Sequence, residues 1–390
     1  MGASHLSRRH FLTLMGSTAG VVALAACTST GGALTANSGG TAPATQKKAL
    51  IFWGHDQHPL DLAAEGFVQQ HPDITWTPVH SDDWLQKAKA AMAADSGAPD
   101  LLWAEATDAQ EWGCNDLLTD LTDIIKPAIN DYSPLKVNET FIVTRGKFIG
   151  WPGDISVSGW YYREDKLKEA GYNAIDFENL TWPDFLAIAK DLKAKDMYAF
   201  VFPADGWSPL FMFILHQLGG TAVSQDGQTI TAGDDKGVQA MQIVKQLWDV
   251  GGLDVDWWSY AYWAALKEGK LIGDFAAAWA RGFWEAQLKD SGEIGGVGHW
   301  RIAKFPAGDG IKYRTGIWAG AQLVNPKAGA NSEGARTFMQ YALGSQDGAT
   351  RCGKWGIIPA YRPYLASKDF LDLRSPMFGD WEFAKFWANQ

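Results

Sequence analysis

The chain has 390 residues, 46% of them hydrophobic and 20% charged, a composition typical of a globular protein long enough for two domains. Its formal net charge of −10, with no block of like charges, argues against a nucleic-acid partner, because phosphate binding needs a basic surface. Twenty tryptophans are the unusual feature. Most of them are expected in cores, but such a surplus also suits stacking against flat apolar ring faces of a ligand.

The first 26 residues are interpreted as an export signal. Residues 7–12 (SRRHFL) carry a twin-arginine pattern, and the apolar run that follows is shorter than the roughly 20 residues of a membrane-spanning helix. The run ends in 24–27 (LAAC), which fits a lipoprotein cleavage site that leaves a lipid on Cys27. We therefore expect twin-arginine export and a mature protein anchored by lipid outside the cytoplasmic membrane of a bacterium. The alternative is a disordered basic N-terminus.

The next segment, residues 27–48, is predicted to be a flexible tether, because Gly, Ser, Thr, Ala and Pro dominate it. Beyond the tether, short apolar runs alternate with segments whose apolar residues recur at helical spacing. The predicted strands lie at 50–53, 74–79 and 101–103, and the predicted helices at 60–70 and 84–92. This strand–helix alternation predicts an α/β fold with a parallel sheet and helices on both of its faces.

The second half of the chain continues in the same style. Residues 181–184 (TWPD) form a capping-box start for a helix, and 199–202 (AFVF) is a predicted strand. A helix is predicted at 237–249 and another begins at Ser332, both with apolar residues along one side. No internal repeat of fixed period is present.

The remaining cysteines, Cys114 and Cys352, are expected to form a disulfide, because an oxidising compartment favours pairing of two leftover thiols. Two separate buried thiols are the alternative. Two cysteines without a histidine at ligand spacing do not make a zinc site, and the eight histidines are scattered. We therefore expect no metal and no cofactor.

Candidate ligand-binding residues follow from a general rule: in open α/β sheets, ligands bind beyond the carboxyl ends of the strands. Asp82 and Asp83 follow the second predicted strand but precede a helix, so helix capping is their first expected role. The polar residues after the first and third predicted strands are expected to line a ligand site; they are His55, Asp56, Glu105 and Thr107.

A whole-chain pattern adds a resemblance. Its motifs stand, in this order, at 97–103 (GAPDLLW), 117–121 (LLTDL), 146–152 (GKFIGWP), 159–172 (GWYYREDKLKEAGY), 181–185 (TWPDF), 268–270 (EGK) and 357–360 (IIPA). Together they resemble the extracellular solute-binding proteins of bacterial sugar ABC transporters, the family that includes maltose-binding protein. The likeness covers roughly residues 49–388. It implies a two-lobed periplasmic-binding-protein fold, each lobe a sheet flanked by helices, with a ligand cleft between them.

The resemblance also implies a division of the chain. The expected parts are a signal peptide at 1–26, a tether at 27–48, the first part of lobe 1 at 49–152, lobe 2 at 153–300, a return to lobe 1 at 301–330, and hinge-proximal C-terminal helices at 331–390. Family members usually continue beyond a segment like 375–380. Two alternatives stay open: either this lineage is trimmed, or the sequence is a fragment of a longer chain that supplies further C-terminal helices.

The resemblance and the local sequence point to further site residues. Family members place an acidic or small polar side chain at the position of Asp154 and Ser156, and an aromatic near Trp279. Trp318 stands among glycines, which allow the backbone to approach a ligand closely, and Trp207 lies in a polar loop. Trp279 and Trp318 are the expected stacking residues. Arg281 and Arg362 are candidates for clamping hydroxyls, with a surface salt bridge as the alternative for each. The tryptophans expected in the core include Trp76, Trp84, Trp182 and Trp248.

The resemblance implies a receptor rather than an enzyme. A sugar or oligosaccharide would bind between the lobes and pass to ABC permease subunits, with the receptor monomeric and held to the membrane by its N-terminal lipid. Nucleophile-elbow, zinc-protease and phosphate-loop motifs are absent. The alternatives are a binding protein for another solute, such as a polyamine or phosphate, and an exported glycosidase with two catalytic carboxylates.

Overall fold

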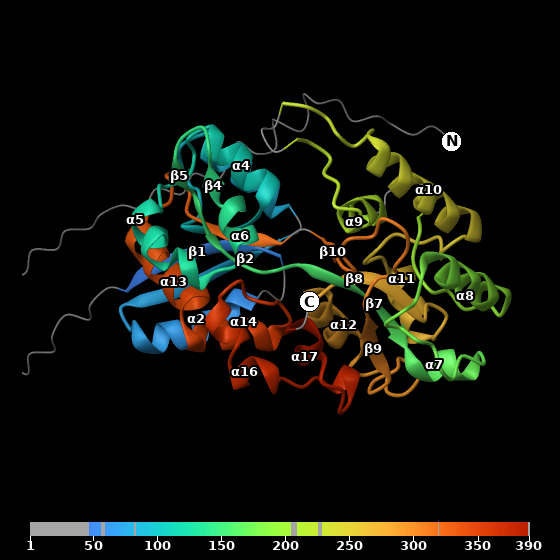
Figure 1. Cartoon of the computed structure of the whole chain (residues 1–390). Helices are drawn as coiled ribbons and strands as arrows, with labels where there is room; N and C mark the ends of the chain where they lie inside the picture. Colours follow the sequence, from blue (N-terminus) through green and yellow to red (C-terminus); the bar gives the residue numbers. More distant parts are fainter. Residues whose placement is uncertain are drawn as a thin grey trace, which may run out of the picture. The chain divides into compact units, whose positions relative to one another are not determined.

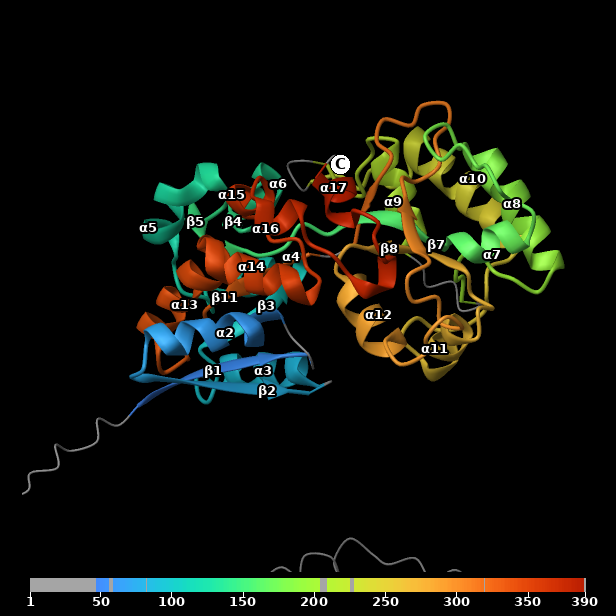
Figure 2. The same ribbon diagram turned by 90° about the horizontal axis from the view of Figure 1, so that it is seen from below.

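The computed structural model describes residues 47–55, 59–81, 83–203, 209–224, 228–318 and 320–388, all within one compact unit, Gln46–Gln390. The predicted signal, Cys27, nearly all of the tether, Asp56, Asp82 and Trp207 lie outside the described residues. Figure 2 shows that the described unit has two lobes, with the C-terminal helices lying across the junction between them. The mixed α/β, two-lobed architecture confirms the expected fold class.

The first lobe is built on a five-stranded sheet with the order β2-β1-β3-β11-β6. Its strands are β1 (Lys48–Gly54), β2 (Ile74–His80), β3 (Leu101–Glu105), β6 (Gly150–Pro152) and β11 (Ala321–Val324). As predicted, the first three are parallel, whereas β11 runs antiparallel to both β3 and β6. A small two-stranded sheet, β4 (Phe141–Ile142) with β5 (Lys147–Phe148), accompanies it.

Helices cover both faces of this sheet, as Figure 2 shows for α2 and α3. Because side chains alternate along a strand, Leu101 enters one core and Leu102 the other. The first core is covered by α2 (Pro59–Gln70), α13 (Ser332–Gly344) and α14 (Gln346–Trp355). The second core is covered by α3 (Trp84–Ala93) and α4 (Ala106–Cys114). Short helices α5 (Thr122–Ile125), η1 (Lys126–Asp131) and α6 (Pro134–Glu139) complete the lobe.

The second lobe is built on a separate antiparallel sheet in which β7 is central (Figure 1). Its strands are β7 (Val157–Arg163), β8 (Gly273–Ala277), β9 (Trp300–Ala303) and β10 (Gly316–Ile317). The core on one face involves α7 (Glu164–Glu169), α8 (Trp182–Ala194), α9 (Leu210–Gln217) and α10 (Asp235–Val250). The other core involves α11 (Tyr260–Lys267), α12 (Ala280–Leu288) and α17 (Phe383–Ala388).

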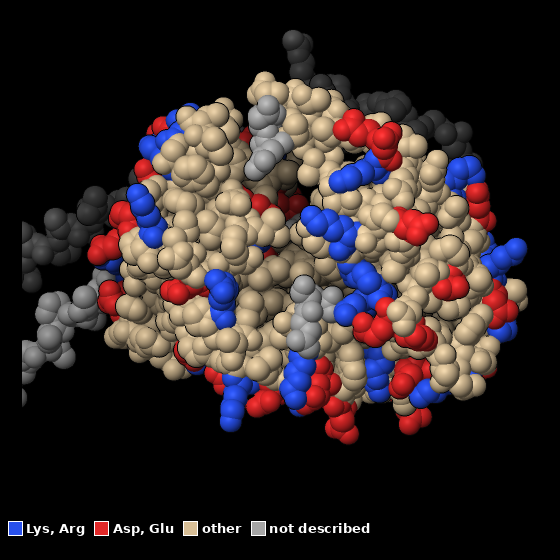
Figure 3. Space-filling view, in the orientation of Figure 1, with Lys and Arg blue, Asp and Glu red and all other residues tan. Residues whose placement is uncertain are grey.

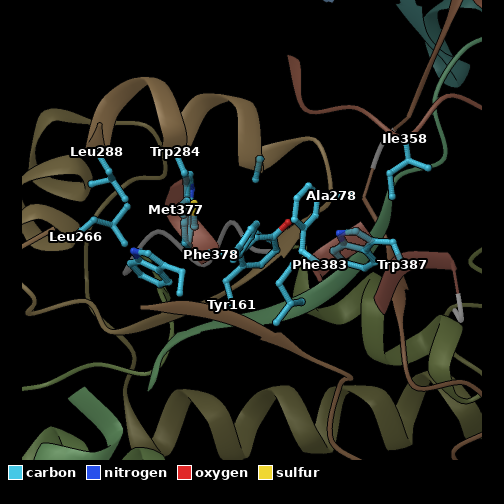
Figure 4. Packing of buried hydrophobic residues seen from close by; sticks show 14 of the residues in the cluster. Tyr161, Leu266, Ala278, Trp284, Leu288, Ile358, Met377, Phe378, Phe383 and Trp387 are labelled. Atoms are coloured by element: carbon cyan, nitrogen blue, oxygen red, sulfur yellow. The ribbon is translucent and has the colours of Figure 1, made fainter. Parts of the chain in front are cut away.

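The C-terminal segment joins the two lobes. It runs through α15 (Arg362–Leu365), α16 (Lys368–Leu371) and η2 (Pro376–Phe378) into α17. Figure 4 shows Phe378, Phe383 and Trp387 packed around Tyr161 of β7. The last helix therefore belongs to the core of the second lobe.

Several predictions of local structure are confirmed and others are corrected. Thr181 and Asp184 form the predicted capping box of α8, and α10 and α13 begin within two residues of their predicted starts. Residues 199–202 do not form a strand; Val201 makes one isolated bridge, to Leu253. β9 and β10 pair with β7, so residues 300–317 lie with the second sheet, and the return to the first lobe falls at about residue 318 rather than 301.

Candidate ligand-binding site between the lobes

The site lies where the chain crosses between the lobes. Figure 3 shows a hollow between the two lobes, with Asp and Glu atoms at its floor. Two crossing segments connect the sheets: residues 153–156 lead from β6 to β7, and Trp318 and Gly320 stand between β10 and β11. A third segment, residues 356–361, runs alongside, and its Ile358 carbonyl accepts from the Ile155 N–H at 2.7 Å.

Four tryptophans gather beside the crossing segments, and we call them the aromatic wall: Trp257, Trp258, Trp279 and Trp318. The Trp279 and Trp318 ring centroids lie 5.4 Å apart, and Trp258 lies 5.5 Å from Trp279. Trp257 contacts Trp318 edge to face at 5.9 Å. Trp257 is buried, whereas the other three keep part of their surface exposed. Partly exposed indoles in contact with one another offer flat apolar faces to a ligand.

Local structure positions these rings. Trp279 lies two residues beyond the end of β8, at the position before α12, and its indole N–H donates to the Trp318 carbonyl at 3.1 Å. Trp258 has a φ of +67°, a left-handed conformation that is rare for a bulky residue. A backbone in such a rarely populated conformation persists only where the surrounding packing holds it. Conformations of this kind are found more often at ligand sites.

Asp154 fastens the crossing segments to each other. Its carboxylate accepts from the Ala321 N–H at 2.7 Å and from the Ser156 hydroxyl at 2.9 Å. The Ser156 carbonyl in turn accepts from the Trp318 N–H at 3.1 Å. Asp154 is 3% exposed, and burial raises the pKa of its carboxyl despite these bonds. These bonds hold the two crossing segments together, and we call this junction, which carries Trp318, the hinge.

A buried cation lies next to this hinge. Lys136 of α6 is buried and pairs with the Glu139 carboxylate. A Cβ added to Gly320 would lie 2.9 Å from the Lys136 ammonium nitrogen, so that ammonium packs against the crossing segment. Desolvation raises the pKa of Glu139, and the Lys136 charge opposes that rise. Lys136 supplies positive charge to a place where Asp154 and Glu139 are both withdrawn from water.

Glu105, at the end of β3, faces the same hinge. It is the strand partner of Ala321, the residue whose N–H donates to Asp154. Loss of hydration, followed by the charges of Asp108 and Asp154, raises the pKa of its carboxyl. Glu105 remains exposed to solvent, unlike the buried Asp154.

The other predicted site residues are more scattered. Thr107 is exposed in the first turn of α4, and His55 is exposed after β1 with its ring 5.6 Å from that of Trp84. Arg281 is 3% exposed, and its guanidinium binds Glu285 at 2.9 Å and the Gly353 carbonyl at 2.7 Å. Arg362 lies on the surface of α15. The structure brings neither arginine to the aromatic wall.

The expected disulfide is absent, because both cysteines are free. Cys114 is exposed at the end of α4, on one side of the first sheet. Cys352 is buried in α14 on the opposite side, where its thiol contacts the carbonyl oxygens of Pro59 and Ala342 at 3.7 Å. The sheet between the two helices prevents pairing.

Comparison with known proteins shows the family of this chain. Residues 63–372 match the family model described as bacterial extracellular solute-binding protein. The chain belongs to this family. A lactose-binding protein of Rhizobium radiobacter is 34% identical over 142 residues, which cover 34% of this chain and 32% of the relative. An arabinooligosaccharide-binding protein of Halalkalibacterium halodurans is 22% identical over 309 residues, covering 75% of this chain and 66% of the relative. The matched stretches thus span one third to two thirds of these curated relatives.

Solved structures share the fold of this solute-binding protein. The ABC-transporter-associated binding protein from B. animalis subsp. lactis Bl-04, solved with β-1,6-galactobiose, superposes with a TM-score of 0.74 at 22% identity. The match covers 88% of this chain and 85% of that one.

Two features are absent from the described part of this solute-binding protein. Within those residues, no three His, Cys, Asp or Glu side chains converge as a metal site would require. None of the helices described there combines the length and the apolar character needed to span a bilayer.

Several residues at or near the candidate site were not predicted from the sequence. Trp257 and Trp258 stand in the aromatic-rich run 257–263, which signalled an unusual segment but not its place in the fold. Lys136 and Asp274 gave no local signal, because a single charged residue in a helix or strand is normally exposed. Asp274 of β8 is 1% exposed and accepts from the Trp257 indole N–H at 2.9 Å.

Proposed function

We propose that this protein is the lipid-anchored, extracytoplasmic substrate-binding component of an ABC sugar importer. The observation that carries the proposal is the aromatic wall, whose partly exposed indoles lie beside the segments that join the two lobes. Sugars present flat patches of C–H groups that stack on such rings. The names of the relatives, which bind lactose, arabinooligosaccharides and β-1,6-galactobiose, support the same class of ligand.

The site residues divide into two roles. Trp279 and Trp318 stack on the sugar, while Glu105, Thr107 and His55 on the first lobe offer polar groups to its hydroxyls. Asp154 and Ser156 act mainly by holding the crossing segments, since each is buried and hydrogen-bonded to its neighbours. Asp56 and Trp207 remain candidates from the sequence.

Binding drives closure of the lobes in this account. A sugar contacts residues of both lobes only when the lobes approach each other, so it binds the closed form more tightly and shifts the population toward it. The crossing segments absorb the movement, because they are the links between the two sheets. The closed protein, monomeric and tethered through Cys27, then delivers its ligand to the permease subunits without chemical change.

A glycosidase would need two carboxylates, one of them free to donate a proton to the substrate. Asp154 is poorly suited to that role, because both of its oxygens already accept hydrogen bonds from the hinge. The named relatives are binding proteins, and binding without turnover is the function that we propose.

Isothermal titration calorimetry of the purified protein against mono- and oligosaccharides tests the proposal. A panel of lactose, galactobiose and arabinooligosaccharides, with spermidine and phosphate as non-sugar solutes, separates the ligand classes. We expect saturable binding of at least one sugar and unchanged sugar by chromatography after incubation. Binding of spermidine or phosphate alone, or release of smaller sugars, would overturn the proposal.

A further inference from the structure

Asp274 is a buried carboxyl group that the proposed binding mechanism leaves unused. It lies on β8, within the core of the second lobe, and it is 1% exposed. One carboxylate oxygen accepts from the backbone N–H groups of Val201 at 3.2 Å and Phe275 at 3.0 Å. The other accepts from the Trp257 indole at 2.9 Å and the Tyr262 hydroxyl at 3.2 Å.

These partners link Asp274 to the aromatic wall. Trp257 contacts Trp318 edge to face at 5.9 Å, and Trp318 contacts Trp279 at 5.4 Å. Trp257 therefore stands between the carboxyl group and the rings that are partly exposed. A change in the strength of the Asp274–Trp257 hydrogen bond therefore affects the partly exposed rings through the contact between Trp257 and Trp318.

We propose that Asp274 is a positioning residue for the ligand site: it fixes the Trp257 indole, and the affinity for sugar therefore depends on the charge of this carboxyl group. The inference rests on the proposed function of the aromatic wall. Asp274 does not contact the sugar itself, and its effect passes through Trp257 to Trp318.

The hydrogen bonds of Asp274 explain why the position of Trp257 depends on the charge of this carboxyl group. The ionised carboxylate is an acceptor only, and it meets four donors, none of them charged. When protonated, the carboxyl must donate, and only the Tyr262 oxygen among these four partners is able to accept, because indole and backbone N–H groups cannot. Protonation thus reverses the Tyr262 bond and leaves Trp257 with a weaker, uncharged acceptor.

The surroundings of Asp274 bring its protonation into the physiological pH range. Burial raises the pKa of Asp274 to about 7, while its four hydrogen bonds oppose the rise. The titratable side chains packed around it are Tyr262 of α11 and Tyr161 of β7, and burial raises the pKa of each. Arg281 and Glu285 of α12 act on Tyr161 but pair with each other at 2.9 Å.

The first test needs no ligand. The indole N–H resonance of Trp257, followed by NMR in the purified protein, should shift with a midpoint near pH 7, and Asp274→Asn should abolish this titration. Asp100→Asn is a matched control, because Asp100 is an equally buried carboxylate held by the backbone N–H groups of Ile51 and Asn331 in the other lobe. A Trp257 resonance unchanged between about pH 5 and 8 would overturn the proposal.

The second test measures affinity. For the sugar that binds best, we expect the dissociation constant to rise about three- to ten-fold as pH falls from about 8 to about 5.5, the size expected from weakening one hydrogen bond. Binding at pH 7 should release protons, seen as a calorimetric enthalpy that varies with the buffer. Asp274→Asn and Trp257→Phe should each remove both effects, whereas Asp100→Asn should retain them. The same pH dependence in Asp274→Asn would refute the inference, while absence of sugar binding at every pH would refute the proposed function and leave the indole titration to decide.

Discussion

The indole N–H of Trp279 donates to the backbone carbonyl of Trp318 at 3.1 Å, so a residue at the start of α12 holds the crossing segment between β10 and β11. The two residues are separated by 39 positions in the chain. Their contact places two indoles side by side at the junction of the lobes, and the proposed function depends on that pairing.

The first prediction concerns stacking. Trp318→Ala should weaken sugar binding by about 1–3 kcal/mol, because an aromatic ring that anchors a ligand carries a large share of the binding energy. Calorimetry measures the loss, and thermal unfolding checks that the variant is folded. Trp248→Ala on α10 is the control, since that side chain is 50% exposed and outside the wall. An unchanged dissociation constant for Trp318→Ala would remove Trp318 from the site.

The second prediction isolates one hydrogen bond. Trp279→Phe keeps an aromatic ring but removes the donor to the Trp318 carbonyl, so affinity should fall by about 0.5–1.5 kcal/mol. Trp182→Phe serves for comparison, because the Trp182 indole N–H has no hydrogen-bond partner among the residues that the structure describes. Equal effects of the two substitutions on affinity would contradict the role given to the Trp279–Trp318 bond.

The third prediction concerns the ion pair beside the hinge, between the buried Lys136 and the partly exposed Glu139. Lys136→Met should lower the free energy of unfolding by about 1–3 kcal/mol, because it leaves the partly exposed Glu139 carboxylate without its cation. Urea unfolding measures the change. Lys385→Met, which breaks an exposed pair with Glu382 on the surface, should cost no more than about 1 kcal/mol. A Lys136→Met variant as stable as the Lys385→Met variant would show that this pair does not stabilise the hinge.

The fourth prediction concerns the two free thiols. In protein lacking Cys27, a thiol reagent should modify only the exposed Cys114 in the native state and both cysteines after unfolding without reductant. Burial raises the pKa of the Cys352 thiol, which further reduces its reactivity when folded. If the unfolded protein showed no free thiol, Cys114 and Cys352 would be joined by a disulfide and this prediction would be wrong.

The fifth prediction is a pH dependence of stability. The folded state holds the proton of Asp274 up to about pH 7, whereas an unfolded carboxyl loses it near pH 4. The unfolded state therefore binds fewer protons between these values, and this group's contribution to the free energy of unfolding falls as pH rises, by up to ~1.4 kcal/mol per pH unit. Above about pH 7 the contribution levels off. The difference in unfolding free energy between wild type and Asp274→Asn should fall across that window; a constant difference would contradict the raised pKa.

The first lobe was largely predictable because its elements carry local signals. Buried parallel strands are continuous apolar runs, and the runs at 50–53 and 101–103 form the central strands β1 and β3. The capping box at Thr181 likewise depends on residues three positions apart. Such features are decided within a short stretch of chain.

Features that depend on distant partners were predicted less well. The antiparallel second sheet and the point of return near residue 318 depend on strands paired across more than a hundred residues. Arg281 has the sequence context of a ligand-binding arginine, yet it bonds to the Gly353 carbonyl, 72 positions away. Trp248 lies on the apolar side of its predicted helix but is half exposed, because the second lobe does not cover it there.

The site was predicted in part. Trp279, Trp318, Asp154 and Glu105 were named from the sequence, and the structure brings them together at the crossing segments. Lys136 and Asp274 were not, since only the packed structure shows that each charge is buried.

The central claim is that a sugar sits between the lobes against the aromatic wall, and a crystal structure with the best ligand of the calorimetric panel tests it most directly. The account predicts a sugar ring stacked on Trp279 or Trp318, with its hydroxyls bound by residues of the first lobe. A ligand bound elsewhere on the molecule, with no contact to either indole, would contradict it.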